Sequence, residues 1–261
     1  MTVSVIPTLD LERAIAEQGY DVIVGFDEVG RGSLAGPVMV GAAAIWARDL
    51  DGPAGASQGG SQESSHLEVP KGVADSKMLT EHKREAIFDE LKSWCASWAV
   101  GAASNKEIDE WGISHALGVA ALRALAQAEA KLGIDGNGML SGKPVKVGAI
   151  LDGPNDYITK TLNTFDAPEV PVPANVTTKV KGDRYCAAVA AAAVIAKVTR
   201  DRSWSNWERN PNMNHMNGPT TRVTVRPHTV TPSLNSGPAT CTACPGTSSD
   251  IRHLIRSPRL R

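Results

Sequence analysis

The segment VIVGFDEVGRGSLAGP, at residues 22–37, most constrains what this chain can fold into. Its apolar run, Val22 to Phe26, predicts a short buried strand. The acids Asp27 and Glu28 follow at the end of that strand, directly before the glycine-rich turn Gly30–Gly32. Glycines let a backbone approach a ligand closely, and carboxylates beside a phosphate-binding turn can hold a hard divalent cation. From this window alone, a strand end with two solvated acids is an equal alternative.

Two further acids occupy similar places in the chain. Asp152 follows the apolar run of VGAILDG, and Asp183 stands in VKGD, just before the alanine-rich stretch CAAVAAAAVIAKVTRDR. Each acid therefore lies where a strand ends or a helix begins. Strands that alternate with helices predict an α/β layered domain.

Hydrophobic periodicity and turn residues give the expected elements. Helices are expected over Leu9–Gln18, Lys106–Trp111, Ser114–Leu132 and Ala187–Val198, and over a helix capped by Thr80 that carries Ile87, Leu91, Trp94 and Trp98 at helical spacing. Strands are expected over Val22–Phe26, Gly36–Trp46, Val100–Ser104 and Val145–Leu151, with a loop over Gly133–Lys143. The segment Asp49–Gly72 is rich in Gly, Ser, Pro and Gln and predicts a flexible surface insertion. The tryptophans are interpreted as core residues.

Composition fits one core of ordinary size, with 261 residues of which 42% are hydrophobic. The chain has no apolar stretch long enough to span a bilayer, and its N-terminus has no basic region followed by an apolar one. We therefore expect a cytoplasmic protein that does not bind membranes. Four scattered cysteines, Cys95, Cys186, Cys241 and Cys244, are expected to be reduced thiols.

Five segments in this chain resemble the motifs of ribonuclease HII. They are DEVGRG, ADSKMLTEHKRE (74–85), LDG, KGD and the helix AAAAVIAKVTRDR. The resemblance runs from about Val22 to Arg202. It implies a ribonuclease H-like mixed sheet flanked by helices, and a catalytic domain over residues 1–202.

The resemblance also implies the catalytic and metal-binding residues. These are Asp27, Glu28, Asp152 and Asp183, which would hold two Mg²⁺ or Mn²⁺ ions; we expect Asp27 and Asp152 to hold the more essential ion. Oxygen ligands suit these hard cations, and the absence of a His and Cys cluster between Val22 and Arg202 argues against zinc.

In the family, a glycine-arginine-glycine turn detects the 2′-hydroxyl that distinguishes RNA from DNA. The matching substrate-binding residues here are Gly30, Arg31, Gly32, Lys77 and Lys181. The implied partners are RNA–DNA hybrids and duplex DNA that contains ribonucleotides, cut by a monomer to leave a 3′-hydroxyl and a 5′-phosphate. A net charge of −1 does not decide whether the chain binds nucleic acid, because a duplex needs only a local basic surface. Each of these cations taken alone is more readily explained as a solvated surface residue.

The chain departs from the family after Arg202. The segment Ser203–Arg261 is rich in Thr, Pro, Asn and Ser, has no apolar period, and predicts a disordered tail. It lacks the family's Asn-Lys-Gly-Tyr-Gly segment, whose tyrosine packs on the sugar beside the ribonucleotide. Codons for His215–Val225 can be chosen so that a shifted reading frame restores that segment, and two flanking segments recover in the same phase. We interpret the tail as a single-base frame slip just after Arg202.

Two alternatives to an active ribonuclease remain. A catalytically impaired form would bind metal or nucleic acid without turnover, because the tyrosine segment is missing. A phosphatase with a similar acidic cluster would act on small phosphoesters and leave duplexes intact.

Overall fold

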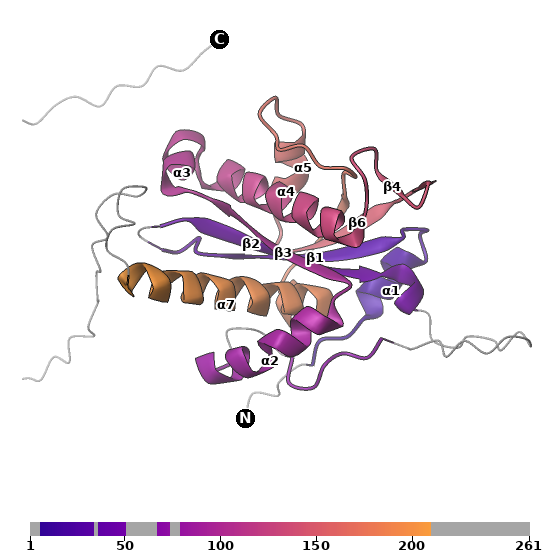
Figure 1. Cartoon of the computed structure of the whole chain (residues 1–261), viewed down its shortest axis with the longest axis horizontal. Helices are drawn as coiled ribbons and strands as arrows, with labels where there is room; N and C mark the ends of the chain where they lie inside the picture. Colours follow the sequence, from indigo (N-terminus) through magenta and orange to yellow (C-terminus); the bar gives the residue numbers. More distant parts are fainter. Residues whose placement is uncertain (1–5, 34–35, 51–66, 74–78, 210–261) are drawn as a thin grey trace, which may run out of the picture. The chain divides into compact units, whose positions relative to one another are not determined.

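The structure is a computed structural model that describes residues 6–33, 36–50, 67–73 and 79–209, all of which belong to one structural unit (Figure 1). A mixed five-stranded sheet forms its centre, in the order β3-β2-β1-β6-β7. The strands are β1 (Val22–Val29), β2 (Val38–Trp46), β3 (Ser97–Ala103), β6 (Val147–Asp152) and β7 (Asn175–Lys179). β1, β2 and β3 pair antiparallel, whereas β6 lies parallel to both β1 and β7. The expected mixed sheet is confirmed.

Helices cover both faces of this sheet. They are α1 (Asp10–Ala16), α2 (Glu81–Trp94), α3 (Asn105–Trp111), α4 (Ile113–Leu132), α5 (Tyr157–Leu162), α6 (Gly182–Tyr185) and α7 (Ala187–Arg209), with a 3₁₀ turn at Ala47–Asp49. α3, α4 and α5 lie on one side of the sheet, and α1, α2 and α7 lie on the other (Figure 1). None of the helices in the described ranges is both long enough and apolar enough to cross a membrane.

Glycines in the strands let the two long helices pack directly on the sheet. A Cβ built on Gly41 would lie 2.4 Å from the carbonyl oxygen of Ala192 in α7, and one on Gly25 would lie 2.3 Å from the carbonyl carbon of Ala188. On the other face, a Cβ on Gly101 would lie 2.0 Å from the Ala120 carbonyl oxygen in α4. The contact between strand and helix backbones is closer than any side chain permits.

Several expectations about individual elements are corrected. Trp98 lies in β3 rather than on the helix of Trp94, because α2 ends at Trp94 and residues 97–103 alternate between buried and partly buried as a strand does. Both tryptophans are partly buried against the α2–α7 cluster, as expected of core residues. The expected loop at Gly133–Lys143 contains part of a small hairpin formed by β4 (Met139–Leu140) and β5 (Lys143–Pro144).

The ends of two segments also differ from expectation. α7 continues past Arg202 to Arg209, so the first residues of the expected disordered tail are helical. The ends of the expected insertion pack on the core: Leu50 is buried, and the Leu67 N–H donates to the Asp49 carbonyl at 3.0 Å. Residues 51–66 and 210–261 lie outside the described residues, as do Cys241 and Cys244; Cys95 and Cys186 are buried free thiols.

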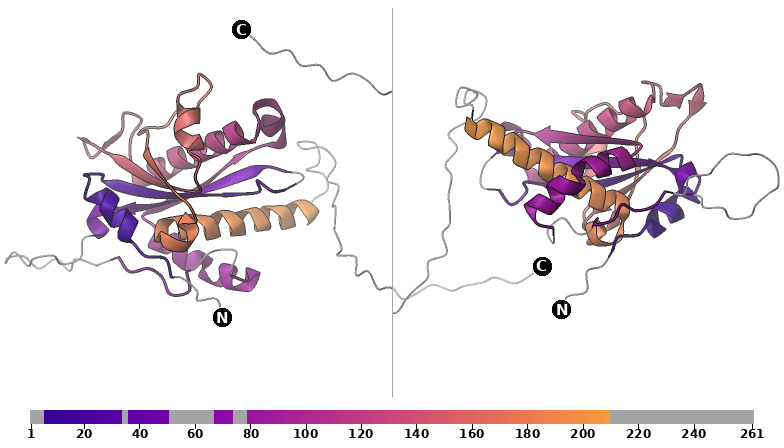
Figure 2. Two further views of the ribbon diagram at one scale, coloured as in Figure 1. Left: turned by 180° about the vertical axis from the view of Figure 1, so that it is seen from behind. Right: turned by 60° about the horizontal axis from the view of Figure 1, so that its bottom comes forward.

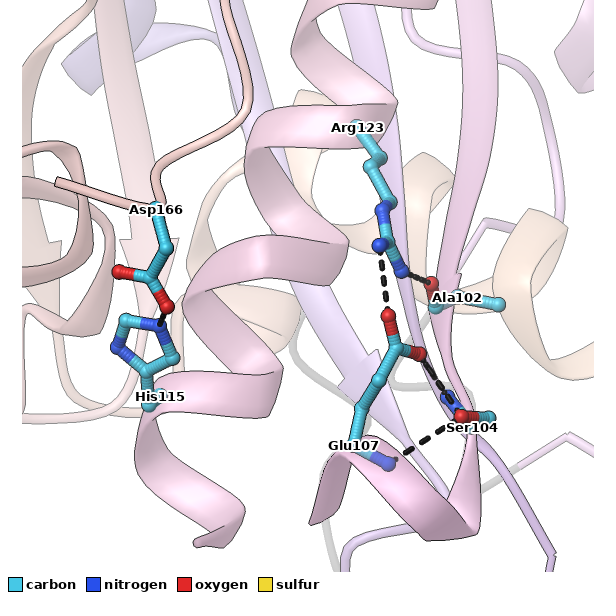
Figure 3. A network of polar contacts seen from close by, with 6 residues as sticks. All are labelled: Ala102, Ser104, Glu107, His115, Arg123 and Asp166. Carbon is cyan, nitrogen blue, oxygen red and sulfur yellow. Dashed lines mark hydrogen bonds and ion pairs between the residues drawn. The ribbon is translucent and has the colours of Figure 1, made fainter. Parts of the chain in front are cut away.

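A polar network ties α3 and α4 to the end of β3 (Figure 3). Ser104 and Glu107 form a capping box at the start of α3, and Arg123 of α4 donates to Glu107 at 2.7 Å and to the Ala102 carbonyl at 2.8 Å. The hydrogen bond from Arg123 is the main reason why the pKa of Glu107 falls to about 2. The network fixes how α3 and α4 lie against the end of β3.

Candidate active site

Asp27 and Asp152 end two neighbouring parallel strands. Phe26 of β1 lies opposite Leu151 of β6, so the next residue along each strand is an aspartate at the same register. Gly25 packs on α7, and side chains two residues apart share a face, so Asp27 points to the α7 side of the sheet. Ile150 belongs to the cluster on that same side, which places Asp152 there as well. The two carboxylates therefore share one edge and one face.

Asp183 reaches this place from the first turn of α6, the short helix that precedes α7. The Gly182 N–H donates to Asp152 Oδ1 at 2.6 Å, which joins the start of α6 to the end of β6. A Cβ on Gly182 would lie only 3.3 Å from Val189 and 3.4 Å from Asp152 Oδ1, so glycine suits this contact. Asp183 is the next residue and is only 3% exposed. A third acid is thus held beside the two strand ends.

Glu28 lies on the other face of the sheet, because it follows Asp27 in an extended strand. Its carboxylate has two partners: Arg31 Nη1 lies 3.1 Å from Oε1, and the Tyr157 hydroxyl donates to Oε2 at 3.0 Å. Tyr157 is the first residue of α5 and is 6% exposed. The fourth acid is therefore oriented by a turn residue and by a helix that follows β6.

The pKa of Tyr157 depends on the charges of neighbouring acids. Its pKa is raised well above the usual value near 10, chiefly by burial, and then by the charge and hydrogen bond of Glu28 and the charges of Asp27 and Asp152. The charges of three of the four acids therefore act on this one hydroxyl group. Sequence reasoning missed this tyrosine, since nothing distinguishes it from other residues of the segment after LDG.

The glycine-rich turn lies beside these acids. Gly30 has φ +97°, a left-handed conformation that favours glycine, and a Cβ there would lie 2.9 Å from the Pro37 carbonyl oxygen and 3.0 Å from Arg200 Nε. Arg200 of α7 also donates to the Ser33 hydroxyl at 2.5 Å. Gly32 has open space around it, and the Arg31 side chain is about half exposed. The turn is thus held by α7 on one side and open on the other.

Of the two lysines expected to bind substrate, the structure describes one. Lys77 lies outside the described residues. Lys181 is exposed, directly precedes Gly182, and has φ +58°, a conformation that costs a residue with a Cβ roughly 1–2 kcal/mol. Strained backbone of this kind is commonly found at functional sites. The structure thus places Lys181 next to the acids.

Comparison with known proteins decides the family. The sequence model of the family described as Ribonuclease HII matches residues 24–226, which include all four acids. This chain belongs to the ribonuclease HII family. The match runs past Arg202, where the resemblance of the motifs was expected to end.

Relatives and solved structures agree with this family. Ribonuclease HII of Streptomyces avermitilis is 39% identical over 198 residues, which is 75% of this chain and 65% of the relative. Ribonuclease HII of Alkaliphilus oremlandii is 34% identical over 79% of this chain and 82% of its own length. The chain spans about 65% of the length of the Streptomyces relatives that it matches.

The fold is also that of known enzymes of this type. The crystal structure of ribonuclease H2 from Pyrococcus horikoshii matches with a TM-score of 0.50 and 25% identity, over 77% of this chain and 82% of that one. A ribonuclease HIII, Bst-RNase HIII in complex with Mn²⁺, shares the fold with a TM-score of 0.50 and 21% identity, over 74% of this chain and 56% of that one. The expected ribonuclease H-like fold is confirmed.

The donor chemistry of this ribonuclease HII family site suits a hard cation. The acids supply oxygen atoms alone, two of the four carboxylates are buried, and Mg²⁺ and Mn²⁺ prefer oxygen ligands. Among the residues that the structure describes, no three His, Cys, Asp or Glu side chains are spaced as a ready set of metal ligands. Glu28 lies on the other face, and Asp152 and Glu28 accept hydrogen bonds from protein donors. The four acids are therefore neighbours at one edge of the sheet, without forming a ready ligand set among the described residues.

Proposed function

We propose that this chain is a metal-dependent endoribonuclease that hydrolyses the RNA strand of RNA–DNA hybrids and cuts 5′ to single ribonucleotides in duplex DNA. The observation that carries this proposal is the shared register of Asp27 and Asp152 on parallel strands, in a chain of the ribonuclease HII family. The products would be a 3′-hydroxyl and a 5′-phosphate. We expect the enzyme to act as a monomer in the cytoplasm.

The four acids would hold the divalent ions, with Asp27 and Asp152 as ligands of the more essential one. Bound Mg²⁺ or Mn²⁺ ions supply a nucleophilic water at neutral pH and neutralise charge on the phosphate oxygens. The protein supplies the orientation of the carboxylates. Gly182 fixes one oxygen of Asp152, while Tyr157 and Arg31 each hold one oxygen of Glu28.

Recognition of the ribonucleotide is assigned to the glycine-rich turn. A backbone N–H in this turn can reach a 2′-hydroxyl because Gly32 brings no side chain and has open space around it. The exposed cations Arg31 and Lys181 flank the acids and would contact the phosphates on either side; we assign the same role to Lys77. This arrangement would favour a duplex over a small phosphoester.

The catalytically impaired form remains the second candidate. The Asn-Lys-Gly-Tyr-Gly segment is missing from residues 203–261. We propose that a single-base frame slip just after Arg202 accounts for this loss. Sequencing the gene tests this reading: a coding strand that yields the missing segment in no frame refutes it.

The decisive experiment is cleavage of a DNA duplex that carries one ribonucleotide, with Mg²⁺ and then with Mn²⁺. Asp27→Asn should abolish incision, and Asp89→Asn, an aspartate on α2 with a side chain 81% exposed, is the matched control that should cut normally. Incision on the 5′ side of the ribonucleotide that is absent only in Asp27→Asn supports the proposal. Binding without incision identifies the impaired form. Hydrolysis of p-nitrophenyl phosphate with the duplex left intact identifies a phosphatase.

A further inference from the structure

A segment that precedes the family's matched residues contacts residues 185–188, which follow Asp183 in the chain. The family match begins at residue 24, whereas Thr8 and the helix α1 lie before it. α1 lies beside the start of α7, on the α7 side of the sheet (Figure 2). We call residues 8–16 the N-terminal strap. Nothing in the family motifs accounts for what this strap contacts.

The strap holds the elbow between α6 and α7 through its backbone. Thr8 and Cys186 form a parallel bridge. In this bridge the Thr8 N–H donates to the Tyr185 carbonyl at 3.0 Å, and the Ala187 N–H donates to the Thr8 carbonyl at 2.9 Å. Leu9 and Ile15 bury their side chains in the same cluster as Cys186.

Glu12 adds a side-chain contact at the start of α7. Its residue is 0% exposed, and Oε1 accepts a hydrogen bond from the Ala188 N–H at 2.9 Å. The first N–H groups of a helix have no partner within the helix, so Glu12 caps α7 from a distant part of the chain. Its Oε2 has no hydrogen-bond partner among the described residues. Among the described residues, this buried carboxyl group therefore accepts one hydrogen bond, from the Ala188 N–H.

The short helix α6, which precedes this elbow, carries atoms of the candidate active site. The Cys186 N–H donates to the Gly182 carbonyl at 2.8 Å, and the Gly182 N–H donates to Asp152 Oδ1. Asp183 lies between these two contacts in the chain. A shift at the start of α7 would therefore move both the donor to Asp152 and the carboxylate of Asp183.

We propose that Glu12 is a positioning residue, which holds the elbow between α6 and α7 so that Asp152 and Asp183 can bind divalent metal together. The inference rests on the proposed function for the assignment of these two acids as metal ligands. Partners that orient metal ligands typically change metal affinity about 10- to 100-fold when they are removed.

Direct binding of Mn²⁺, measured by calorimetry on the intact chain, tests the proposal without needing turnover. Glu12→Ala should raise the dissociation constant of Mn²⁺ about tenfold or more, because the Ala188 N–H loses its partner. Glu12→Gln should keep nearly normal affinity, because its amide oxygen can accept the same hydrogen bond. Cleavage at limiting Mn²⁺ should follow the same order.

Glu129 of α4 offers a matched control. It is 1% exposed, and its Oε2 accepts one backbone N–H, that of Val172, at 3.1 Å, but α4 lies on the face of the sheet opposite to Glu12, and Val172 is not a residue of the site. Glu129→Ala removes a comparable buried contact and should leave Mn²⁺ affinity unchanged. Glu12→Asp is the gentler variant, since it keeps the carboxylate but shortens its reach by one methylene; it should weaken Mn²⁺ binding even where Glu12→Ala does not fold.

Three results would overturn the inference. They are wild-type Mn²⁺ affinity in folded Glu12→Ala or Glu12→Asp, an equal loss in Glu129→Ala, and no Mn²⁺ binding by the unmodified chain. Failure of the proposed function is a separate result. A chain that binds Mn²⁺ but leaves the ribonucleotide-containing duplex intact refutes cleavage, while the comparison of Glu12 variants by calorimetry still decides the inference.

Discussion

Replacing Glu129 by glutamine should remove a pH dependence of stability that the folded protein builds into its core. Glu129 is 1% exposed, Oε2 accepts from the Val172 N–H, and Oε1 has no hydrogen-bond partner among the described residues. Burial raises its pKa from 4.5 to about 7, against a smaller opposing effect of the Val172 hydrogen bond. The folded state therefore holds a proton that the unfolded state releases between these two pH values.

The sign and size of this pH dependence follow from the difference between the pKa values of Glu129 in the folded and unfolded states. Because the folded pKa is the higher one, the stabilising effect of the proton is complete below about pH 4.5 and is lost as pH rises through about 7. At about 1.4 kcal/mol for each pH unit that separates the two pKa values, the loss is about 3 kcal/mol. Glutamine resembles the protonated side chain and does not titrate, so Glu129→Gln should escape this loss.

Urea unfolding of both proteins at about pH 5 and about pH 8.5, followed by tryptophan fluorescence, measures the effect. About 2.5 kcal/mol of this loss falls between these two pH values, so with a denaturant slope of about 2 kcal/mol/M the midpoint of Glu129→Gln should gain about 1.3 M on the wild type. All other titratable groups are the same in both proteins, so their effects cancel in the comparison. An equal midpoint difference at the two pH values would refute the assignment of a raised pKa to Glu129.

Two further predictions concern the site and the packing around it. Tyr157→Phe removes the donor to Glu28 Oε2. Since hydrogen bonds to charged groups contribute about 1.5–3 kcal/mol, kcat/KM for a ribonucleotide-containing duplex should fall about 10- to 150-fold; an unchanged value would contradict the orienting role. Gly41→Ala places a Cβ 2.4 Å from the Ala192 carbonyl oxygen and should destabilise the fold by about 3 kcal/mol in thermal unfolding, whereas Gly32→Ala, with open space around it, should not. Equal melting temperatures of the two glycine variants would show that α7 can move away from β2.

The sequence predicts the positions of the site acids better than their surroundings. Asp27 and Asp152 each end an apolar run, and the structure confirms that these runs are strands whose ends coincide. The parallel pairing of the two strands could not be derived from periodicity, because it joins segments far apart in the chain. The resemblance to the ribonuclease HII family implied a mixed sheet but not which of its strands are parallel.

The residues whose roles or elements could not be predicted from the sequence owe them to tertiary contacts. Glu12 is a charged residue in a short helix, and only the docking of α1 on α7 shows that it is buried. Tyr157 gains its role from the placement of α5 over Glu28. Trp98 continues a helical spacing, and the strand alternation of residues 97–103 outweighs that pattern once β3 pairs with β2.

The contacts that orient Glu28 and Asp152 separate two possible causes of a loss of activity in this chain. The donors to Glu28 and Asp152 are Tyr157, Arg31 and Gly182, and the strap secures the elbow no later than Ala188. All of these residues precede Arg202, so loss of the family's Asn-Lys-Gly-Tyr-Gly segment would leave them in place. A defect that arises from the tail should therefore raise the KM for duplex while the Mn²⁺ dissociation constant stays low. A defect that arises from the acid cluster should weaken Mn²⁺ binding itself, and the two constants measured side by side separate the causes.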